Sequence, residues 1–358
     1  MSKQVMVRDV PIGGGAPVVI QSMSNIPSWD EEGILRQIGE LTEAGCQIVR
    51  LAVPDQEGLR VFGRVRQRTE TPLVADIHFD YRLAIGALEA GADKVRINPG
   101  NIGSRDRVQK VVDCAKAHHA PIRIGVNSGS VEKDILRKYG HVGPEALAES
   151  ALQNIRLVEE MGFDDIVVSM KSSDVRMNYD AHRIAASKTD HPFHIGITEA
   201  GTPAMGKIKS AAGIGSLLLA GIGDTIRVSL TADPVEEVRF ARQLLEAIGL
   251  RTPRFELVSC PTCGRTRIDL EGLAETVEAR LSREKDLPEG LKVAVMGCVV
   301  NGPGEAREAD YGVCGGLGKG IVLRKGETVL TAEEGDLAEA LIRVIREDHP
   351  LKSDMEKA

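Results

Sequence analysis

The stretch that decides the fold is Glu43-Ala-Gly-Cys-Gln-Ile-Val-Arg50, which recurs as Glu89-Ala-Gly-Ala-Asp-Lys-Val-Arg96. Looser copies begin at Glu160 and at Ala220. In each copy, a glycine that can end a helix is followed at once by an apolar run that suits a strand. The repeat therefore predicts alternating helices and strands, and its four copies would supply strands two, four, six and eight of one sheet.

Eight apolar segments of this kind precede residue 250, and nearly all are followed by a helical pattern. Several lack strict alternation and are rich in β-branched residues, as strands buried on both faces should be. Eight such units over about 250 residues match a TIM (β/α)8 barrel in number and size. The predicted strands are Val18–Gln21, Ile48–Val53, Leu73–Ile77, Lys94–Asn98, Ile122–Val126, Ile166–Met170, Phe193–Ile197 and Thr225–Ser229.

The segments outside the eight units suggest a hairpin, an insertion and a second domain. The first fifteen residues could form a hairpin that closes the bottom of the barrel, and Ser128–His141 is a charged insertion with a short helix. We expect the barrel over 1–250, a linker over 251–256 and a small α+β domain over 257–358. Within that domain we predict a helix over Leu270–Arg283, strands over Lys292–Met296 and Ile321–Arg324, a last helix over Ala332–Ile345, and a frayed tail over Glu347–Ala358.

Composition places the chain among globular proteins of a reducing compartment. Hydrophobic residues make up 42% and charged residues 27% of the 358 residues, and the net charge is −7. A negative net charge with only 3% aromatic residues argues against a nucleic-acid surface. No apolar segment is long enough to span a membrane or to act as a secretion signal, so we expect a cytoplasmic location. Six cysteines in that compartment are thiols or metal ligands rather than disulfides.

The predicted carboxyl ends of the barrel strands, where such barrels hold their active sites, carry many polar residues. Five cations stand there without an equal number of carboxylates: Arg50, Arg96, Arg123, Lys171 and Arg227. The other polar residues at these ends are Asp76, His78, Asn127, His194, Glu199 and Ser229. An anionic ligand, such as a phosphate, explains the excess of cations. The alternative is that each arginine pairs with a carboxylate inside the barrel.

Cysteines mark a second candidate site beyond residue 256. Cys260-Pro-Thr-Cys263 presents two thiolates on one loop, and Cys298 adds a third shortly before Asn301-Gly-Pro-Gly-Glu305. This spacing fits a metal ion or an iron–sulfur cluster. Cys314 or Glu305 could be the fourth ligand, and the softness of thiolate favours Cys314.

The chain resembles the bacterial 4-hydroxy-3-methylbut-2-en-1-yl diphosphate synthases over nearly its full length. Nine segments carry this resemblance: IQSM (20–23), IVRLAVP (48–54), DIHFDYRLA (76–84), VRINPGNIG (95–103), IRIGVNSGS (122–130), IGITEAG (195–201), DTIRVSL (224–230), SCPTCGR (259–265) and VMGCVVNGPGEA (295–306). The family implies a TIM barrel that binds 2-C-methyl-D-erythritol 2,4-cyclodiphosphate, followed by a domain with a [4Fe-4S] cluster. Its reaction is a reductive dehydration that opens the cyclic diphosphate, with electrons from flavodoxin or ferredoxin.

The resemblance also implies roles for individual residues. The cluster ligands would be Cys260, Cys263, Cys298 and Glu305, which replaces Cys314 as the expected fourth ligand. The diphosphate would bind Arg50, Arg96, Arg123, Lys171 and Ser229, to which we add Arg227. The reacting carbons would lie among Asp76, Asn127, His194 and Glu199, with Asn301 beside the cluster. We expect Glu199 to be the proton donor, a role that Asp76 or His78 could share.

The family further implies a head-to-tail homodimer, in which the cluster domain of one chain caps the barrel of the other. Two other functions stay open on chemical grounds. Cys260, Cys263, Cys298 and Cys314 could hold a structural zinc ion. The barrel could instead belong to a phosphosugar aldolase or isomerase, with Lys171 as a Schiff-base amine.

Overall fold

The computed structural model describes residues 1–284 and 286–350. They form two compact units, one over Met1–Arg251 and one that begins at Thr252. Among the described residues, no helix is long and apolar enough to cross a membrane.

The first unit is a TIM barrel, as the repeat predicts. Eight parallel strands follow the order β8-β7-β6-β5-β4-β3-β10-β9, and a parallel bridge between Val168 and Phe193 joins the two ends of that order. Strands β4, β5 and β6 end one residue earlier than predicted, and β9 and β10 hold only two residues each. The strands are β3 (Val19–Met23), β4 (Ile48–Ala52), β5 (Leu73–Asp76), β6 (Lys94–Ile97), β7 (Ile122–Asn127), β8 (Ile166–Lys171), β9 (His194–Ile195) and β10 (Thr225–Ile226).

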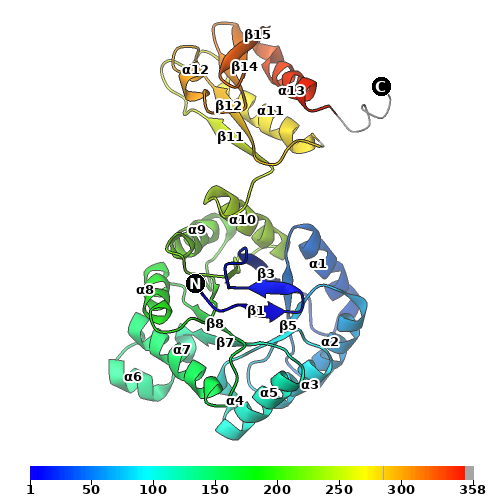
Figure 1. Ribbon diagram of the computed structural model, residues 1–358, viewed down its shortest axis with the longest axis vertical. Helices are drawn as coiled ribbons and strands as arrows, with labels where there is room; N and C mark the ends of the chain where they lie inside the picture. The colour runs from blue at the N-terminus through cyan, green and yellow to red at the C-terminus, as the bar shows by residue number, and fades with distance from the viewer. Residues whose placement is uncertain (285, 351–358) are drawn as a thin grey trace. The chain divides into compact units, whose positions relative to one another are not determined.

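Helices form a ring around these strands (Figure 1). They are α1 (Glu31–Glu43), α2 (Gln56–Arg68), α3 (Tyr81–Glu89), α4 (Pro99–Ile102), α5 (Arg105–Ala117), α6 (Lys133–Tyr139), α7 (Pro144–Glu159), α8 (Val175–Ala186), α9 (Pro203–Leu219) and α10 (Pro234–Ala247). An aspartate caps the start of five of them and accepts a hydrogen bond from a free backbone N–H of the first turn. These aspartates are Asp30, Asp55, Asp80, Asp174 and Asp233.

The Ala-Gly repeat ends its helices by one recurring hydrogen-bond pattern. After α1, the N–H of Cys46 donates to Leu41 O and the N–H of Gly45 donates to Thr42 O. The same pair of bonds recurs after α3 and after α9. This pattern needs a left-handed residue, and Gly45 supplies it with φ +107°. The repeat in the sequence is therefore a repeated helix stop that leads straight into the next strand.

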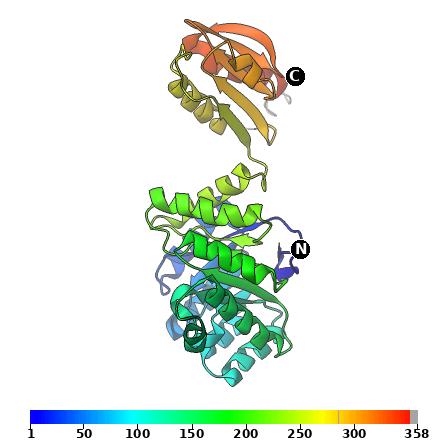
Figure 2. The same ribbon diagram turned by 90° about the vertical axis from the view of Figure 1, so that its left-hand side faces the viewer.

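A hairpin and an insertion complete the first unit, as predicted. Strands β1 (Val5–Val7) and β2 (Val10–Ile12) pair antiparallel. The hairpin crosses the ring of strands in Figure 1 and lies at one end of the barrel in Figure 2. Its buried side chains pack on the first residues of the barrel strands, in a cluster of Val5, Val7, Ile12, Val19, Ile48, Val74 and Val167. The predicted insertion contains a 3-10 turn, η1 (Ser128–Ser130), and helix α6.

The second unit has a mixed five-stranded sheet in the order β11-β12-β13-β14-β15, which is the predicted α+β class. β11, β12 and β13 are parallel, whereas β14 and β15 run antiparallel. Helices α11 and α13 pack with the sheet around one apolar core. The elements are β11 (Phe255–Ser259), α11 (Leu270–Arg283), β12 (Leu291–Met296), α12 (Gly302–Glu305), β13 (Tyr311–Gly315), β14 (Lys319–Arg324), β15 (Glu327–Glu333), η2 (Glu334–Asp336) and α13 (Leu337–Asp348).

The sequence prediction for this unit needs three corrections. The last helix begins at Leu337 rather than Ala332, because Ala332 pairs with Gly320 in the hairpin of β14 and β15. Strands β13 and β15 were not predicted. Strand β11 begins at Phe255, inside the segment 251–256 that we predicted as a linker. Of the predicted frayed tail, Glu347 and Asp348 are helical, and 351–358 lie outside the described residues.

Candidate functional site

Asp76 is the central carboxylate at the carboxyl ends of the barrel strands. Its side chain is wholly buried, with Arg50 Nη2 3.6 Å and Arg96 Nη1 3.5 Å from its oxygens. Burial by itself would raise the pKa of Asp76, but the charges of Arg50 and Arg96 outweigh burial and hold that pKa below its usual value. Asp76 is therefore ionised at neutral pH and offsets part of the positive charge of this site.

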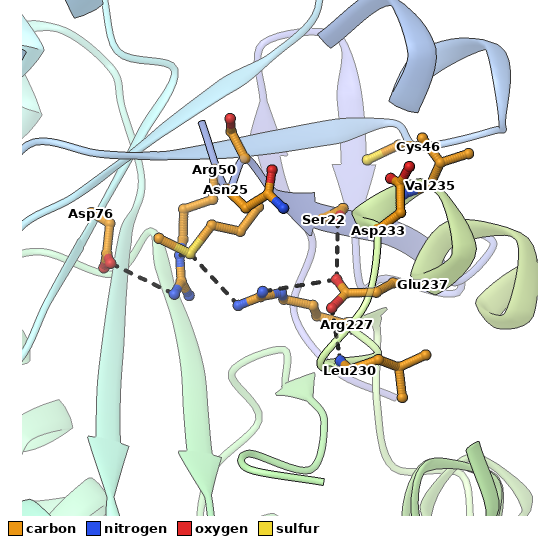
Figure 3. A network of polar contacts seen from close by, with 12 residues as sticks. Ser22, Asn25, Cys46, Arg50, Asp76, Arg227, Leu230, Asp233, Val235 and Glu237 are labelled. Atoms are coloured by element: carbon orange, nitrogen blue, oxygen red, sulfur yellow. Dashed lines mark hydrogen bonds and ion pairs between the residues drawn. The ribbon is translucent and has the colours of Figure 1, made fainter. Parts of the chain in front are cut away.

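Arg50 and Arg227 are linked through the sulfur of Met23 (Figure 3). Arg50 Nε donates to Met23 Sδ at 3.0 Å, and Arg227 Nη1 lies 3.6 Å from the same atom. Arg227 Nη2 lies 3.8 Å from Glu237 Oε2, and Glu237 also accepts hydrogen bonds from Ser22 and Leu230. The two arginines are thus held at their outer ends by carboxylates, at distances too long for tight hydrogen bonds.

Within the described part of the chain, no carboxylate forms an ion pair with either remaining cation, Arg123 or Lys171. Arg123 is 1% exposed, and its Nε and Nη1 lack hydrogen-bond partners among the described residues. Lys171 is buried as well. Burial, and then the neighbouring arginines, lower the pKa of both groups well below the usual values. Among the described residues, Asp76 and Glu237 are the buried carboxylates of the chain, so the predicted excess of cations is present.

The other predicted residues differ in exposure. His194 is fully buried, with Nδ1 3.4 Å from Thr225 Oγ1, and burial lowers its pKa well below the usual value. The side chain of His78 is 55% exposed, with Nε2 3.7 Å from Asp76 Oδ2. Asn127 ends β7 beside Lys171 of β8, and Ser229 follows β10. Glu199 is exposed and has φ +52°, a left-handed backbone that costs about 1 kcal/mol or more for a residue other than glycine.

The cysteines gather at the carboxyl edge of the parallel strands β11, β12 and β13. Cys260 follows β11, and its Sγ accepts a hydrogen bond from Gly297 N at 3.3 Å. Cys298 follows β12, where backbone N–H groups of Asn301 and Val300 donate to its sulfur and lower its pKa. Cys263 sits in a turn closed by Thr266 N and Cys263 O. Hydrogen bonds from Arg265, chiefly its backbone N–H and then its side chain, lower the pKa of Cys263.

Cys314 and Glu305 occupy contrasting positions near these cysteines. Cys314 lies within β13, fully buried against Met296 and Ala306. Its Sγ lies so close under Gly302 that a Cβ there would come within 3.0 Å of it. Burial raises the pKa of Cys314 to about 12. Glu305 ends the single turn α12 and is exposed. Arg265 lies near it: the pKa of Arg265 is raised mainly by Cys263 and to a smaller extent by the charge of Glu305.

The spacing of the cysteines bears on what they could hold. A tetrahedral zinc ion with Zn–S bonds of about 2.3 Å needs sulfur atoms within about 4 Å of one another. Among the described residues, the one group of three His, Cys, Asp or Glu ligand atoms within 4.8 Å is Glu159, at the end of α7, with Asp164 and His191 on the loops that lead into β8 and β9. Among the described residues, the cysteine sulfur atoms do not form such a group.

Three residues of the barrel site escaped sequence prediction. Lys94 begins β6, is fully buried, and has no partner for Nζ among the described residues. A signal was available, because Lys94 stands two residues before Arg96 and therefore on the same face of the strand. Met23 and Glu237 gave no signal, since a methionine in a strand and a glutamate in the first turn of a helix are ordinary features.

Comparisons with known proteins cover both units. The family model of the GcpE TIM-barrel domain matches residues 2–242, and that of the GcpE protein C-terminal domain matches residues 256–347. The 4-hydroxy-3-methylbut-2-en-1-yl diphosphate synthase (flavodoxin) of Clostridium perfringens is 54% identical over 96% of this chain and 98% of its own length. The protein of the same name from Bacillus subtilis is 50% identical over 100% of this chain and 95% of its own length.

A solved structure also matches the barrel. It is phospho-2-dehydro-3-deoxyheptonate aldolase from Thermotoga maritima, with a TM-score of 0.50 and 14% identity over 69% of this chain and 75% of that one. At this identity the match shows the barrel fold alone.

Proposed function

The chain belongs to the GcpE family, and from this premise we propose that it is a 4-hydroxy-3-methylbut-2-en-1-yl diphosphate synthase that takes its electrons from flavodoxin. The enzyme is an oxidoreductase of isoprenoid precursor biosynthesis. Its substrate is 2-C-methyl-D-erythritol 2,4-cyclodiphosphate, and the reaction is the reductive opening of that ring with loss of water. The observation that carries the proposal is the joint presence of a cation-rich barrel site and a thiol-rich sheet edge in one full-length match.

The excess of buried cations in the barrel supports a diphosphate ligand. Arg50, Arg96, Arg123, Lys171, Arg227 and Ser229 would bind it. Leaving buried cations unpaired is costly, and diphosphate oxygens would supply the missing charge and hydrogen-bond acceptors. The same cations then stabilise the negative charge that develops on the diphosphate as the ring opens.

Cys260, Cys263, Cys298 and Glu305 would hold a [4Fe-4S] cluster in the second unit. The three cysteines lie at one sheet edge, and the N–H groups around Cys298 suit an anionic ligand. Cys314 is a poor candidate, because it is packed under Gly302 inside a strand, whereas Glu305 is exposed. A cluster held in this way would supply the two electrons of the reaction, and Asn301 would lie beside it.

The acidic residues of the barrel site would have different roles in proton transfer. Asp76 is unsuited to donate a proton, since its neighbouring arginines keep it ionised. It would instead orient His78, which lies 3.7 Å away. Glu199 remains our candidate donor, because its strained left-handed backbone marks a position kept for its side chain rather than for local stability. Asn127 and His194 would contact the part of the substrate that reacts.

We also propose the domain division and assembly that the sequence suggested. Residues 1–250 would bind substrate, the part of 251–256 that precedes β11 would act as the linker, and 257–358 would hold the cluster, with the cluster domain of one chain capping the barrel of a second. Large apolar side chains are exposed beside the cysteines, at Val299, Val300 and Leu317. Others are exposed on loops and helix starts that follow the barrel strands, at Phe79, Met205 and Ile208. Exposed apolar side chains that cluster in this way usually mark a surface that another protein covers, so both sets support the proposed capping.

The test is to purify the full-length chain without oxygen and measure iron, sulfide and turnover together. We expect iron and sulfide in the purified protein and conversion of the cyclic diphosphate only with reduced flavodoxin. Cys298→Ser should lose both iron and turnover, whereas Arg123→Met should keep iron and lose turnover. Turnover without iron would contradict the proposal, as would trapping of substrate on Lys171 by borohydride, which indicates a Schiff base.

A further inference from the structure

Glu237 is a buried carboxylate that the mechanism above does not use. It lies in the first turn of α10, is 4% exposed, and stands 3.8 Å from Arg227, one of the residues assigned to the diphosphate. Burial raises the pKa of the Glu237 carboxyl above its usual value, while the charge of Arg227 and the position at the start of α10 favour the ionised form.

Two hydrogen bonds fix this carboxylate from separate parts of the barrel. Glu237 Oε1 accepts from Leu230 N at 2.8 Å, on the loop that follows β10. Glu237 Oε2 accepts from Ser22 Oγ at 3.4 Å, on β3. Figure 3 shows the carboxylate between Ser22 and Leu230. Leu230 directly follows Ser229 in the chain. The side chain of Glu237 therefore fixes the backbone beside Ser229 and also faces the guanidinium of Arg227.

Arg227 itself is held loosely. The distance of 3.8 Å to Glu237 is an ion pair without a hydrogen bond, and Nη1 reaches only the sulfur of Met23 at 3.6 Å. Among the described residues, Arg227 Nε has no hydrogen-bond partner. Glu237 and Met23 therefore orient the guanidinium of Arg227, and its N–H groups can still donate hydrogen bonds to a ligand.

We propose that Glu237 is a positioning residue for the diphosphate site, which acts by aiming Arg227 and by fixing the backbone next to Ser229. The inference rests on the proposed function in that Arg227 is taken to bind the diphosphate. Glu237 does not touch the ligand, and its effect passes through Arg227.

Inorganic pyrophosphate is the probe, because its binding needs neither the cluster nor turnover. Calorimetric titration of the full-length chain would compare wild type, Glu237→Gln, Arg227→Met and the double variant. Glutamine is isosteric and keeps the acceptor for Leu230 N, but it removes the charge that faces Arg227. We expect Glu237→Gln to weaken pyrophosphate binding about tenfold, because Arg227 loses the charge that aims it at the ligand. In the Arg227→Met background, the same change should alter binding by about twofold or less.

Glu236 provides a matched control. It is the preceding residue on α10, but it is more exposed and faces Lys207 at 3.6 Å. Glu236→Gln should leave pyrophosphate affinity unchanged. If Glu237→Gln fails to fold, Glu237→Asp keeps the charge, withdraws it by one methylene and should weaken binding in the same Arg227-dependent way.

The outcomes separate the two proposals. An equal loss of affinity in both backgrounds, or no loss in either, overturns the role of Glu237 and leaves it as a packing residue. If Arg227→Met itself leaves pyrophosphate affinity unchanged, the assignment of Arg227 to the diphosphate fails, and with it the proposed binding site.

Discussion

The carboxylate of Asp76 lies 3.6 Å from the guanidinium of Arg50, in a site where buried cations outnumber buried carboxylates. Arg96 approaches the other oxygen of the same carboxylate at 3.5 Å. One acidic side chain thus offsets two arginines in the ligand-free barrel.

Asp76→Asn should therefore destabilise the ligand-free barrel by roughly 3 kcal/mol or more, since it leaves the buried Arg96 and the partly buried Arg50 without this counter-charge. Urea unfolding of the full-length chain would measure this loss. Pyrophosphate should restore part of the stability, because it binds the folded state and supplies negative charge. Asp113→Asn is the control, as Asp113 is exposed and accepts a hydrogen bond from Gln109 on the same helix. Equal stability of the two variants would show that Asp76 does not offset the arginines.

Cys298→Ser and Cys314→Ser should differ in their effect on the cluster. Serine at 298 removes a proposed ligand, so iron content and visible absorbance should fall to background. Serine at 314 changes a sulfur that is packed under Gly302, so iron content should stay near that of wild type while stability falls by about 1 kcal/mol or more. Iron analysis and thermal melts of anaerobic protein measure both. The reverse pattern of iron loss would make Cys314 the fourth ligand in place of Glu305.

Glu199 allows a test that separates stability from catalysis. Glu199→Gln should leave pyrophosphate affinity near that of wild type and cut turnover by about a hundredfold or more, the scale of one general acid. Glu199→Gly should lose turnover equally, yet its melting temperature should be no lower than that of wild type, because glycine adopts φ +52° without strain. Near-normal turnover in both variants would end the candidacy of Glu199 as proton donor.

The burial of His182 predicts that the barrel loses stability in acid. It is fully buried against Phe193, its Nδ1 donates to Asn178 O at 2.7 Å, and burial lowers its pKa from 6.5 to about 4. The unfolded chain therefore binds a proton at pH 5 that the folded chain does not, so stability is full above about pH 6.5 and falls as pH drops toward 4.

The full effect of this one group is about 3 kcal/mol, at about 1.4 kcal/mol for each pH unit. Urea unfolding at pH 7 and pH 4.5 would show the loss, and His182→Gln should lessen it, while His194 keeps its own contribution. If His182→Gln loses as much stability as wild type over this range, His182 does not sense acid.

The sequence predicts the barrel well because its signal is local and repeated. The Ala-Gly helix stop at Gly45 returns at Gly91 and Gly221, and each copy needs only its own neighbours to form. The second unit was harder to predict. β13 contains Gly312 and Gly315, which weaken the strand pattern. β15 is an exposed edge strand, and the residues after it have a helical pattern, so its end was predicted as part of the last helix.

Residues of the candidate site could be predicted from the sequence only where a charged residue interrupts an apolar strand. Arg50, Arg96 and Arg123 stand out in apolar strands, whereas Glu237 looks like any acidic residue at the start of a helix. Its partner Ser22 is 215 residues away in the sequence, so only the closed barrel brings the two together. Contacts of that kind arise from topology and leave no local pattern.

The hairpin of β1 and β2 gives the barrel a single entrance. Val5, Val7 and Ile12 fill the end at which the strands begin, so substrate can enter and product can leave only at the other end. Under the proposed function, electrons must arrive at that same end. Under the proposed assembly, substrate exchange would require this end to be uncovered, whereas electron transfer would require the cluster domain of a second chain to cover it.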